Sequence, residues 1–432
     1  MTPEVVGGLG FCLLFMLLLI GVPIGVAMGV SGLVGLFLLL PPKAVIAKLA
    51  LGPFDFVCSF TFATLPLFFL MGQVIFTTGQ GRMFYVVARK WFGRVAGGLA
   101  MATIVASAGF GALTASSIAC AVTIGQIAYE EMRRYGYNKA FALGSIAAGG
   151  TLGSLIPPSG FLIIYGIITE NSIGKLFVGA ILPGIICTIA YVIVAAIVTG
   201  FRPGWGPGAA PVRLREKFVA LQEIWELICL IIFCMGGLLY GLFTSTEAGA
   251  IGALGAFVSA ALRKKLSWSV IKESLSETLK NTGMIFSVLI GATVFNVFCA
   301  ASNLPEHLAL WVANLDVSAL EIMLIIVLIY IILGALMDEA SIQLITLPIF
   351  YPIVIKLGFD PIWFGVMQAR LLQIGMIIPP IAIIDFILAG MFKEKLSVVY
   401  RGVIPFLIMD MFVLLLFTLY PEIVLWLPSK MK

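Results

Sequence analysis

The sequence predicts an all-α polytopic membrane protein built as an inverted repeat, with two helical hairpins and two broken helices. Three observations predict this fold. The 432 residues are 61% hydrophobic and 11% charged, with a mean hydropathy of +1.13. Two interruptions rich in glycine and proline recur at matching positions in the two halves of the chain. The charges that flank these interruptions differ between the halves.

Composition sets the class of protein. A chain this apolar cannot bury its surface in one soluble globule, and about ten to twelve apolar segments have spanning or near-spanning length. The apolar run 10–40 follows no Lys or Arg and is too long for a signal peptide, so we expect it to stay in the mature chain. The net charge of +5 is spread over loops, which indicates membrane orientation and no binding of nucleic acid. The seven cysteines lack C-x-x-C spacing and are interpreted as small apolar residues.

One polar segment divides the chain. Residues 201–217, FRPGWGPGAAPVRLREK, are rich in Gly and Pro and carry four basic side chains. We interpret this segment as a cytoplasmic linker. It separates a first repeat, 1–200, which holds scaffold helices and an arm, from a second repeat, 218–432.

The two repeats match each other around their interruptions. In the first, the sequence Gly-Ala-Leu begins at Gly111, and the pair Pro157-Pro158 begins 46 residues later. In the second, Gly-Ala-Leu begins at Gly334, and Pro379-Pro380 begins 45 residues later. Paired interruptions of this kind point to the binding site of a membrane transporter. The predicted elements are hairpins at about 97–132 and 318–356, and broken helices at about 138–170 and 361–392.

The flanking charges predict the orientation of each hairpin. Basic residues stand on both sides of the first, namely Arg82, Arg89, Lys90 and Arg94 before it and Arg133, Arg134 and Lys139 after it. This hairpin is expected to enter the membrane from the cytoplasm. The second hairpin is not flanked by basic residues on both sides. It is preceded by Glu306, Asp316 and Glu321 and followed by Lys356 and Asp360. It is expected to enter from the opposite side, although arms of about 16 to 18 residues also allow two full spans.

A helix break at membrane depth requires a use for the backbone groups that it frees. Each unsatisfied N–H or C=O group costs several kcal/mol unless it faces protein or a wet cavity. Carbonyls freed at 153–158 and 375–380 can replace the hydration shell of a small cation, and helix N-termini after the breaks favour an anion. The breaks therefore predict cation coupling with an anionic solute. The alternative is that proline kinks only shape helix packing.

Several motifs resemble one family over almost the whole chain. They are GFGALTASS at 109–117, TLGSLIPPS at 151–159, FTSTEAGAIGA at 243–253, LGALMDEASIQLITLPIFYP at 333–352, IGMIIPP at 374–380 and TLYPEIVLWLP at 418–428. In this order they resemble the large membrane subunit of tripartite ATP-independent periplasmic (TRAP) transporters. The resemblance implies an elevator-type secondary importer in the bacterial inner membrane, driven by sodium ions (Na+). It also implies a periplasmic substrate-binding protein that delivers a small organic anion, and a small four-helix membrane subunit on another chain.

The resemblance implies two sodium sites. The first matches the side chains of Ser107 and Thr114 and the backbone around Gly153, Ile156 and Pro158. The second matches the backbone of Gly334, Gly375, Ile378 and Ile381. The family's usual threonine before the second proline pair is Ile378 here, and its common asparagine is Leu371, so the second site lacks these polar ligands.

Five residues are candidates for binding the solute. They are Ser116, Ser117, Asp338, Ser341 and Arg370. Arg370 has a planar fork that suits a carboxylate, sulfonate or phosphate, and the alternative is an internal ion pair with Asp338, Glu339 or Asp385. Asp338 is a carboxylate at the second hairpin tip, and its alternative role is to cap a helix. The serines are hydroxyl donors that otherwise satisfy backbone groups.

The sequence does not predict an enzyme. His307 is the only histidine, and no nucleophile elbow, metal-ligand cluster or Walker loop accompanies it. Glu247, three residues after Thr244, is expected to cap a scaffold helix. A stand-alone ion-coupled dicarboxylate carrier and an anion channel remain alternatives. A channel needs a continuous polar lining, whereas the polar residues here gather at two tips.

Overall fold

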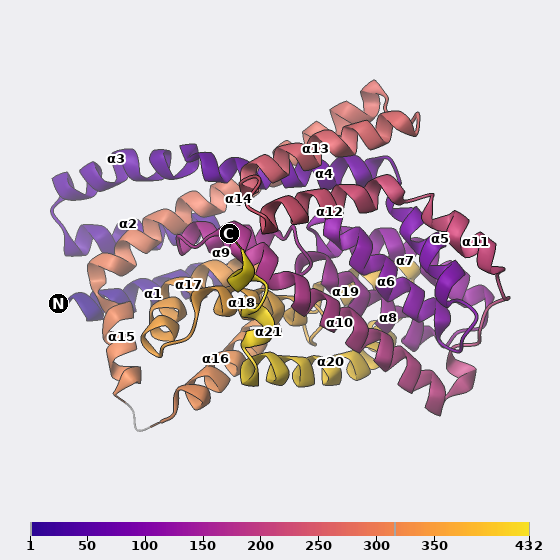
Figure 1. Cartoon of the computed structure of the whole chain (residues 1–432). Helices are drawn as coiled ribbons and strands as arrows, with labels where there is room; N and C mark the ends of the chain where they lie inside the picture. Colours follow the sequence, from indigo (N-terminus) through magenta and orange to yellow (C-terminus); the bar gives the residue numbers. More distant parts are fainter. Residues whose placement is uncertain (1, 315–316, 432) are drawn as a thin grey trace.

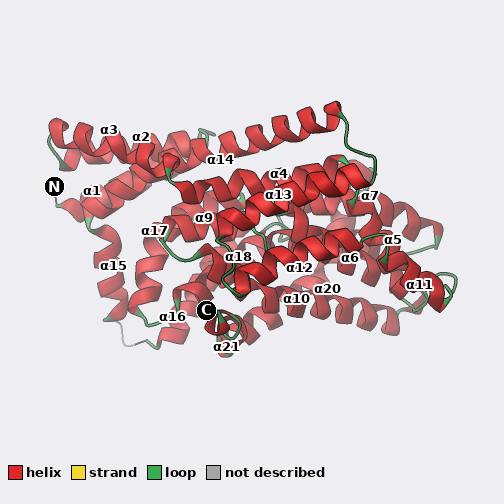
Figure 2. Cartoon of the chain, turned by 45° about the horizontal axis from the view of Figure 1, so that its top comes forward, coloured by secondary structure: helices red, strands yellow, loops and turns green. Residues whose placement is uncertain are grey.

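The computed structural model describes residues 2–314 and 317–431, and within them every regular element is a helix (Figures 1 and 2). Among the described residues, six helices are long and apolar enough to cross a membrane, or seven if a pair bent by 55° is one span. Five further apolar helices in the same residues have 10 to 17 residues. The described chain is thus an all-α, multi-span protein, as its composition predicted. Asp316, one of the predicted flanking charges, lies outside the described residues.

One group of helices packs together, and we call it the scaffold. Its members are α1 (Pro3–Leu19), α2 (Ile24–Leu39), α3 (Pro42–Cys58), η1 (Phe60–Ala63), α4 (Thr64–Thr77), α12 (Trp225–Leu239), α13 (Ser245–Leu262), α14 (Trp268–Ser302) and α15 (Leu304–Ala313). The 35-residue α14 packs along α2 and α4, and α13 packs along α4 (Figure 1). Helix α13 begins with the expected capping box, in which Thr244 and Glu247 satisfy each other's backbone N–H groups.

The first repeat contains the predicted hairpin and broken helix. The hairpin consists of α6 (Gly98–Thr114) and α7 (Ser117–Arg134), and the broken helix consists of α8 (Lys139–Thr151), η2 (Leu152–Ser154) and α9 (Gly160–Ile168). The hairpin turns at Ala115, whose φ of 53° is left-handed, and Ser116 then caps α7. A non-glycine residue in this conformation costs about 1–2 kcal/mol, so packing must hold the tip in place.

The second repeat contains the same elements. Its hairpin consists of α16 (Ala319–Gly334) and α17 (Glu339–Lys356), and its broken helix consists of α18 (Pro361–Gly375) and α19 (Ile383–Phe392). Each start has a chemical cause: Ser318 and Glu321 form a capping box for α16, and Asp360 caps α18, which has Pro361 in its first turn. Both predicted breaks are therefore present.

The remaining helices connect and enclose these elements. They are α5 (Gly81–Phe92), α10 (Ile173–Phe201), η3 (Pro203–Trp205), α11 (Leu214–Leu221), α20 (Leu396–Leu419), α21 (Glu422–Leu425) and η4 (Pro428–Lys430). The linker is shorter than predicted. Helix α10 continues through Phe201 and α11 begins at Leu214, because both ends of 201–217 carry helix-forming residues and only the middle is rich in Gly and Pro.

The hairpins and broken helices of the two repeats interlock. Helix α19 packs on α7, where the rings of Phe392 and Tyr129 are 4.2 Å apart between centroids. Helix α17 meets α9 through the Gln343 amide, which donates to the carbonyl of Phe161 at 2.8 Å. Tyr165 of α9 donates in turn to the carbonyl of Pro361 at 2.7 Å. These contacts join the four interrupted elements into one unit, which we call the core unit.

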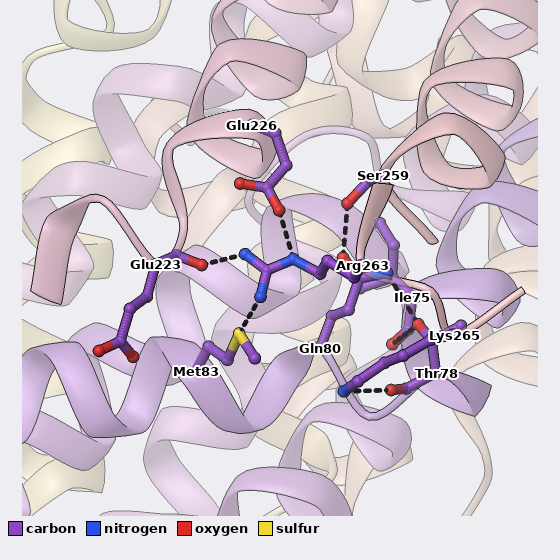
Figure 3. A network of polar contacts seen from close by, with 9 residues as sticks. All are labelled: Ile75, Thr78, Gln80, Met83, Glu223, Glu226, Ser259, Arg263 and Lys265. Carbon is purple, nitrogen blue, oxygen red and sulfur yellow. Dashed lines mark hydrogen bonds and ion pairs between the residues drawn. The ribbon is translucent and has the colours of Figure 1, made fainter. Parts of the chain in front are cut away.

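A polar network fastens the end of α13 to its neighbours (Figure 3). The guanidinium of Arg263 contacts the carboxylate of Glu226, the carbonyl of Glu223 and the sulfur of Met83. Beside it, Ser259 donates to the side-chain oxygen of Gln80 at 2.7 Å. Because the charge of Arg263 is paired, it stabilises the junction of α5, α12 and α13. The network joins the scaffold helices α12 and α13 to α5, and none of its residues belongs to a helix break.

Each hairpin tip lies against its own break through a pair of glycines. A Cβ atom added at Gly111 would lie 2.6 Å from the Cα of Gly153. One added at Gly334 would lie 2.8 Å from the Cα of Gly375. These separations leave no room for a side chain, so the shared glycine of the two repeats is a packing requirement.

We expect Gly111→Ala and Gly334→Ala each to lower the melting temperature of the purified protein by several degrees. Alanine normally stabilises a helix by about 1 kcal/mol relative to glycine, so a loss reports the steric clash. Gly390→Ala is the matched control, because a Cβ there meets nothing within 4 Å. Equal melting temperatures for all three variants would show that the tips do not need close contact.

Candidate functional site

Both hairpin tips and both broken helices line one cavity of about 340 Å³. Thr114, Ala115, Ser116, Ser117, Ile118 and Ala119 come from the first tip, Glu339 and Ala340 from the second, Gly160, Phe161 and Ile164 from α9, and Met376 from the second break. The scaffold closes the wall with Phe69, Gly72, Gln73 and Phe76 of α4 and with Asn281, Met284 and Ile285 of α14.

Two helix N-termini face this cavity. Helix α7 begins at Ser117 and helix α9 at Gly160, and residues of both first turns line the cavity. The free N–H groups and dipoles of such termini attract anions. Ser116 caps α7 by accepting from the N–H of Ala119 at 3.3 Å, and Ser117 is paired with Ser154. Both predicted serines therefore lie in the cavity wall, and both also hold the tip together.

The residues of the first predicted sodium site gather at the first break. Gly111 and Gly153 are in contact there, and the hydroxyl of Thr114 donates to the carbonyl of Phe110 at 3.2 Å. The hydroxyl of Ser107 is buried and has no hydrogen-bond partner, which is costly unless a ligand uses it. Ile156 and Pro158 lie in the same break, after η2. An unused buried oxygen beside freed backbone is suitable for a small hard cation.

The second break offers fewer ligands. Gly334 and Gly375 are in contact, and the N–H of Ile381 donates to the carbonyl of Ala335 at 3.3 Å. The carbonyl of Pro380 already accepts from the hydroxyl of Tyr400 at 2.7 Å. Ile378 supplies no hydroxyl, as the sequence indicated. The predicted residues of the second sodium site therefore offer backbone oxygens as ligands.

The two breaks also differ in exposure. Pro157 and Pro158 are buried, whereas Pro379 and Pro380 are exposed and Ile381 is 46% exposed. The first break is therefore enclosed by the chain and the second is accessible from outside it.

Asp338 and Ser341 form a helix cap. The carboxylate of Asp338 accepts from the N–H of Ser341 at 3.0 Å and from its hydroxyl. Neither residue lines the cavity between the tips, and Asp338 instead borders a separate apolar cavity beside α2 and α14. The capping role, which was the alternative, is the one that the geometry shows.

Arg370 is in an internal ion pair, but not with a predicted partner. Its side chain is fully buried and pairs with Asp410 of α20, while Tyr191 of α10 accepts from it at 2.9 Å and Gln373 at 3.1 Å. Neither Asp338, Glu339 nor Asp385 contacts it. It also does not line the cavity. The prediction missed Asp410 because that acid is 40 residues away, although an acid within the apolar run FLIMDMFVLLL was a signal for it.

Two acids that were not predicted as site residues stand out. Glu339 is 7% exposed and lines the cavity, and its Oε1 atom has no partner. Asp385 is fully buried in the first turn of α19, and neither of its carboxylate oxygens has a partner. A carboxylate buried without a partner is costly and marks a functional site by default. Their position inside apolar segments was the available signal.

The comparisons with known proteins decide the family. Residues 11–423 match the model of the tripartite ATP-independent periplasmic transporter, DctM component. The chain belongs to the DctM family of TRAP transporter large permeases. It is 34% identical, over 93% of its length and 94% of the relative's, to the C4-dicarboxylate large permease DctM of Pseudomonas aeruginosa. It is 31% identical, over 99% and 98%, to the sialic acid large permease SiaM of Vibrio cholerae.

Solved structures share the fold of this DctM-family permease. The YdaH transporter of Alcanivorax borkumensis superposes with a TM-score of 0.59 at 15% identity, over 89% of this chain and 90% of that one. MtrF of Neisseria gonorrhoeae gives 0.55 at 14%, over 87% and 85%. A TRAP large permease is a multi-span transport protein that works with a small membrane subunit and a periplasmic binding protein. The predicted family and the predicted all-α, multi-span fold class are therefore confirmed.

We expect Arg370→Met to destabilise the permease by about 3–5 kcal/mol, because it leaves Asp410 buried and unpaired. The double variant Arg370→Met with Asp410→Leu should recover most of that loss, since it removes both charges. Thermal unfolding of the purified variants checks both expectations. If the Arg370→Met protein had normal stability but no uptake, Arg370 would belong to the solute-binding site.

Asp385→Asn is expected to leave the melting temperature of the permease unchanged or higher, while slowing uptake. The substitution removes an unpartnered buried charge, which costs stability in the native protein. Asp410→Asn is the control, because it removes a paired carboxylate and should lower the melting temperature. Equal decreases of the melting temperature in both variants would show that Asp385 has a structural role.

Proposed function

We propose that this chain imports a small organic anion together with sodium ions, as the large permease of a TRAP transporter. The observation that carries the proposal is the meeting of two hairpin tips and two helix breaks around one cavity. Such a site has two gates of similar construction, one from each repeat, which is what alternating access requires. A channel would instead need a continuous polar pore.

The first break is the stronger candidate for binding sodium. Ser107 supplies an unused buried hydroxyl, Thr114 supplies a hydroxyl that donates to Phe110, and the segment 153–158 supplies backbone oxygens. The second site at Gly334, Gly375, Ile378 and Ile381 relies on backbone oxygens, with Asp385 one turn beyond it. Sodium prefers oxygen ligands of both kinds, as hard cations do.

The helix N-termini of α7 and α9 support an anionic solute. The named relatives transport C4-dicarboxylates, sialic acid and, in Oleidesulfovibrio alaskensis, isethionate, and all three classes of solute carry an acid group. Ser116 and Ser117 stand at the same wall and offer hydroxyl groups. The acid group of the solute is therefore placed against the first tip. Delivery by a periplasmic binding protein follows from the family.

An elevator movement agrees with the division of the fold. The core unit carries the cavity's tips and breaks, while α4 and α14 of the scaffold supply the opposite wall. Sliding the core unit past this wall would move the bound solute from one side of the membrane to the other. A small four-helix subunit would brace the scaffold in the bacterial inner membrane. Each sodium ion that enters contributes about 2.3 kcal/mol per 100 mV of membrane potential.

The test is uptake by proteoliposomes that contain the permease and its small subunit, with the purified binding protein and its solute outside. Uptake should require the binding protein and an inward sodium gradient, and it should slow when the membrane potential is collapsed. Ser107→Ala should raise the sodium concentration needed for half-maximal uptake several-fold. Thr103→Val is the control, because its buried hydroxyl only bonds the carbonyl of Leu99 on the same helix.

Each component of this uptake assay tests one alternative to the proposed function. Uptake without the binding protein would indicate a stand-alone carrier, and flux that does not saturate would indicate a channel. Uptake that is unchanged when choline replaces sodium would overturn the proposal.

A further inference from the structure

Glu339 is a buried carboxylate in the cavity wall with no partner of its own. It is 7% exposed, its buried Oε1 atom has no hydrogen-bond partner, and Glu339 forms no ion pair within the described chain. Its neighbour Asp338 is already used by the cap at Ser341. A glutamate in the first turn of a helix gains from the helix dipole even in contact with solvent. The helix dipole therefore does not explain why Glu339 is buried without a partner. Its position indicates that Glu339 binds a ligand.

The rest of the described cavity wall carries no charge that could balance Glu339. Its lining contains no Lys, Arg or His, and Arg370 is in its ion pair with Asp410 elsewhere. A solute with acid groups alone would therefore meet an unpaired carboxylate at short range in a low-dielectric site. This arrangement disfavours a simple dicarboxylate.

The cavity wall has two parts that attract groups of opposite charge. The N-termini of α7 and α9, with Ser116 and Ser117, attract an acid group. Glu339, which begins α17 in the other hairpin, attracts a cation. The rings of Phe69, Phe76 and Phe161 line the space between scaffold and tips, and aromatic faces also favour a cationic ammonium group.

We infer that the solute is an organic acid that also carries an ammonium group, an amino carboxylate or amino sulfonate, and that this ammonium group binds Glu339. This inference rests on the proposed function and specifies its solute. One salt bridge then satisfies the buried acid and at the same time orients the solute between the two tips. Solutes without the amino group lose this contact and leave Glu339 unpaired, so the site discriminates against them strongly.

Matched solute pairs test the inference directly. The purified permease with its small subunit is heated in sodium chloride with taurine or isethionate, aspartate or succinate, and glutamate or glutarate. Within each pair the two solutes share the acid group and chain length and differ in the amino group. We expect at least one amino member to stabilise the complex with at least tenfold higher apparent affinity than its partner. In Glu339→Gln this difference should disappear, and in Glu339→Asp part of it should remain.

The outcomes separate this inference from the proposed function. The wild-type comparison needs no variant, and Glu339→Gln should melt no lower than wild type because it removes an unpaired charge. No stabilisation by any amino member, or equal affinities within every pair, overturns the inference while sodium-driven uptake still stands. A Glu339→Gln protein that keeps the amino preference but needs more sodium also overturns it, because Glu339 would then be a ligand of the coupling ion.

Discussion

The close contact of each hairpin tip with its own helix break is the constraint on which the rest of the structure depends. A break at membrane depth frees backbone groups that only protein, water or an ion can satisfy. The contacts of Gly111 with Gly153 and of Gly334 with Gly375 bring a tip close enough to cover those groups. In the proposed function, each hairpin separates from its break during transport, so that the same contact serves as a gate and as part of the binding site.

The two repeats use the same design with different chemistry. The first break is enclosed and has hydroxyl groups at Ser107 and Thr114. The second is accessible from outside the chain, has isoleucine where a hydroxyl is usual, and is followed by the unpartnered Asp385. In the proposed transport cycle, this inequality gives the two ends of the site different free energies, while the gradients of ions and solute set the direction of net transport.

Local chemistry made most of the fold predictable, while long-range pairing did not. Short sequence stretches, such as the proline pairs and Thr244 to Glu247, determine the breaks, tips and caps. Their positions in the structure therefore agree with the positions predicted from the sequence to within a few residues. The partner of Arg370 depends on how α18 packs against α20, and no local pattern reports that. For the same reason, Asp338 was expected at the site whereas Glu339, the next residue, points into the cavity. One residue along a helix turns a side chain by about 100°, and the sequence does not show which face meets the core.

The buried charges connect the solute to the coupling ions. Arg370 and Asp410 neutralise each other, so the core unit retains Glu339 and Asp385 as acids without a partner. An empty core unit with both acids ionised would carry uncompensated negative charge past the scaffold, which is costly in a low-dielectric environment. In the proposed cycle, sodium ions at the breaks offset that charge, and the solute's ammonium group pairs with Glu339 while its acid group faces the helix N-termini. In the proposed cycle the fully loaded unit therefore moves more easily than one that holds the solute or the ions alone, and this difference couples the two.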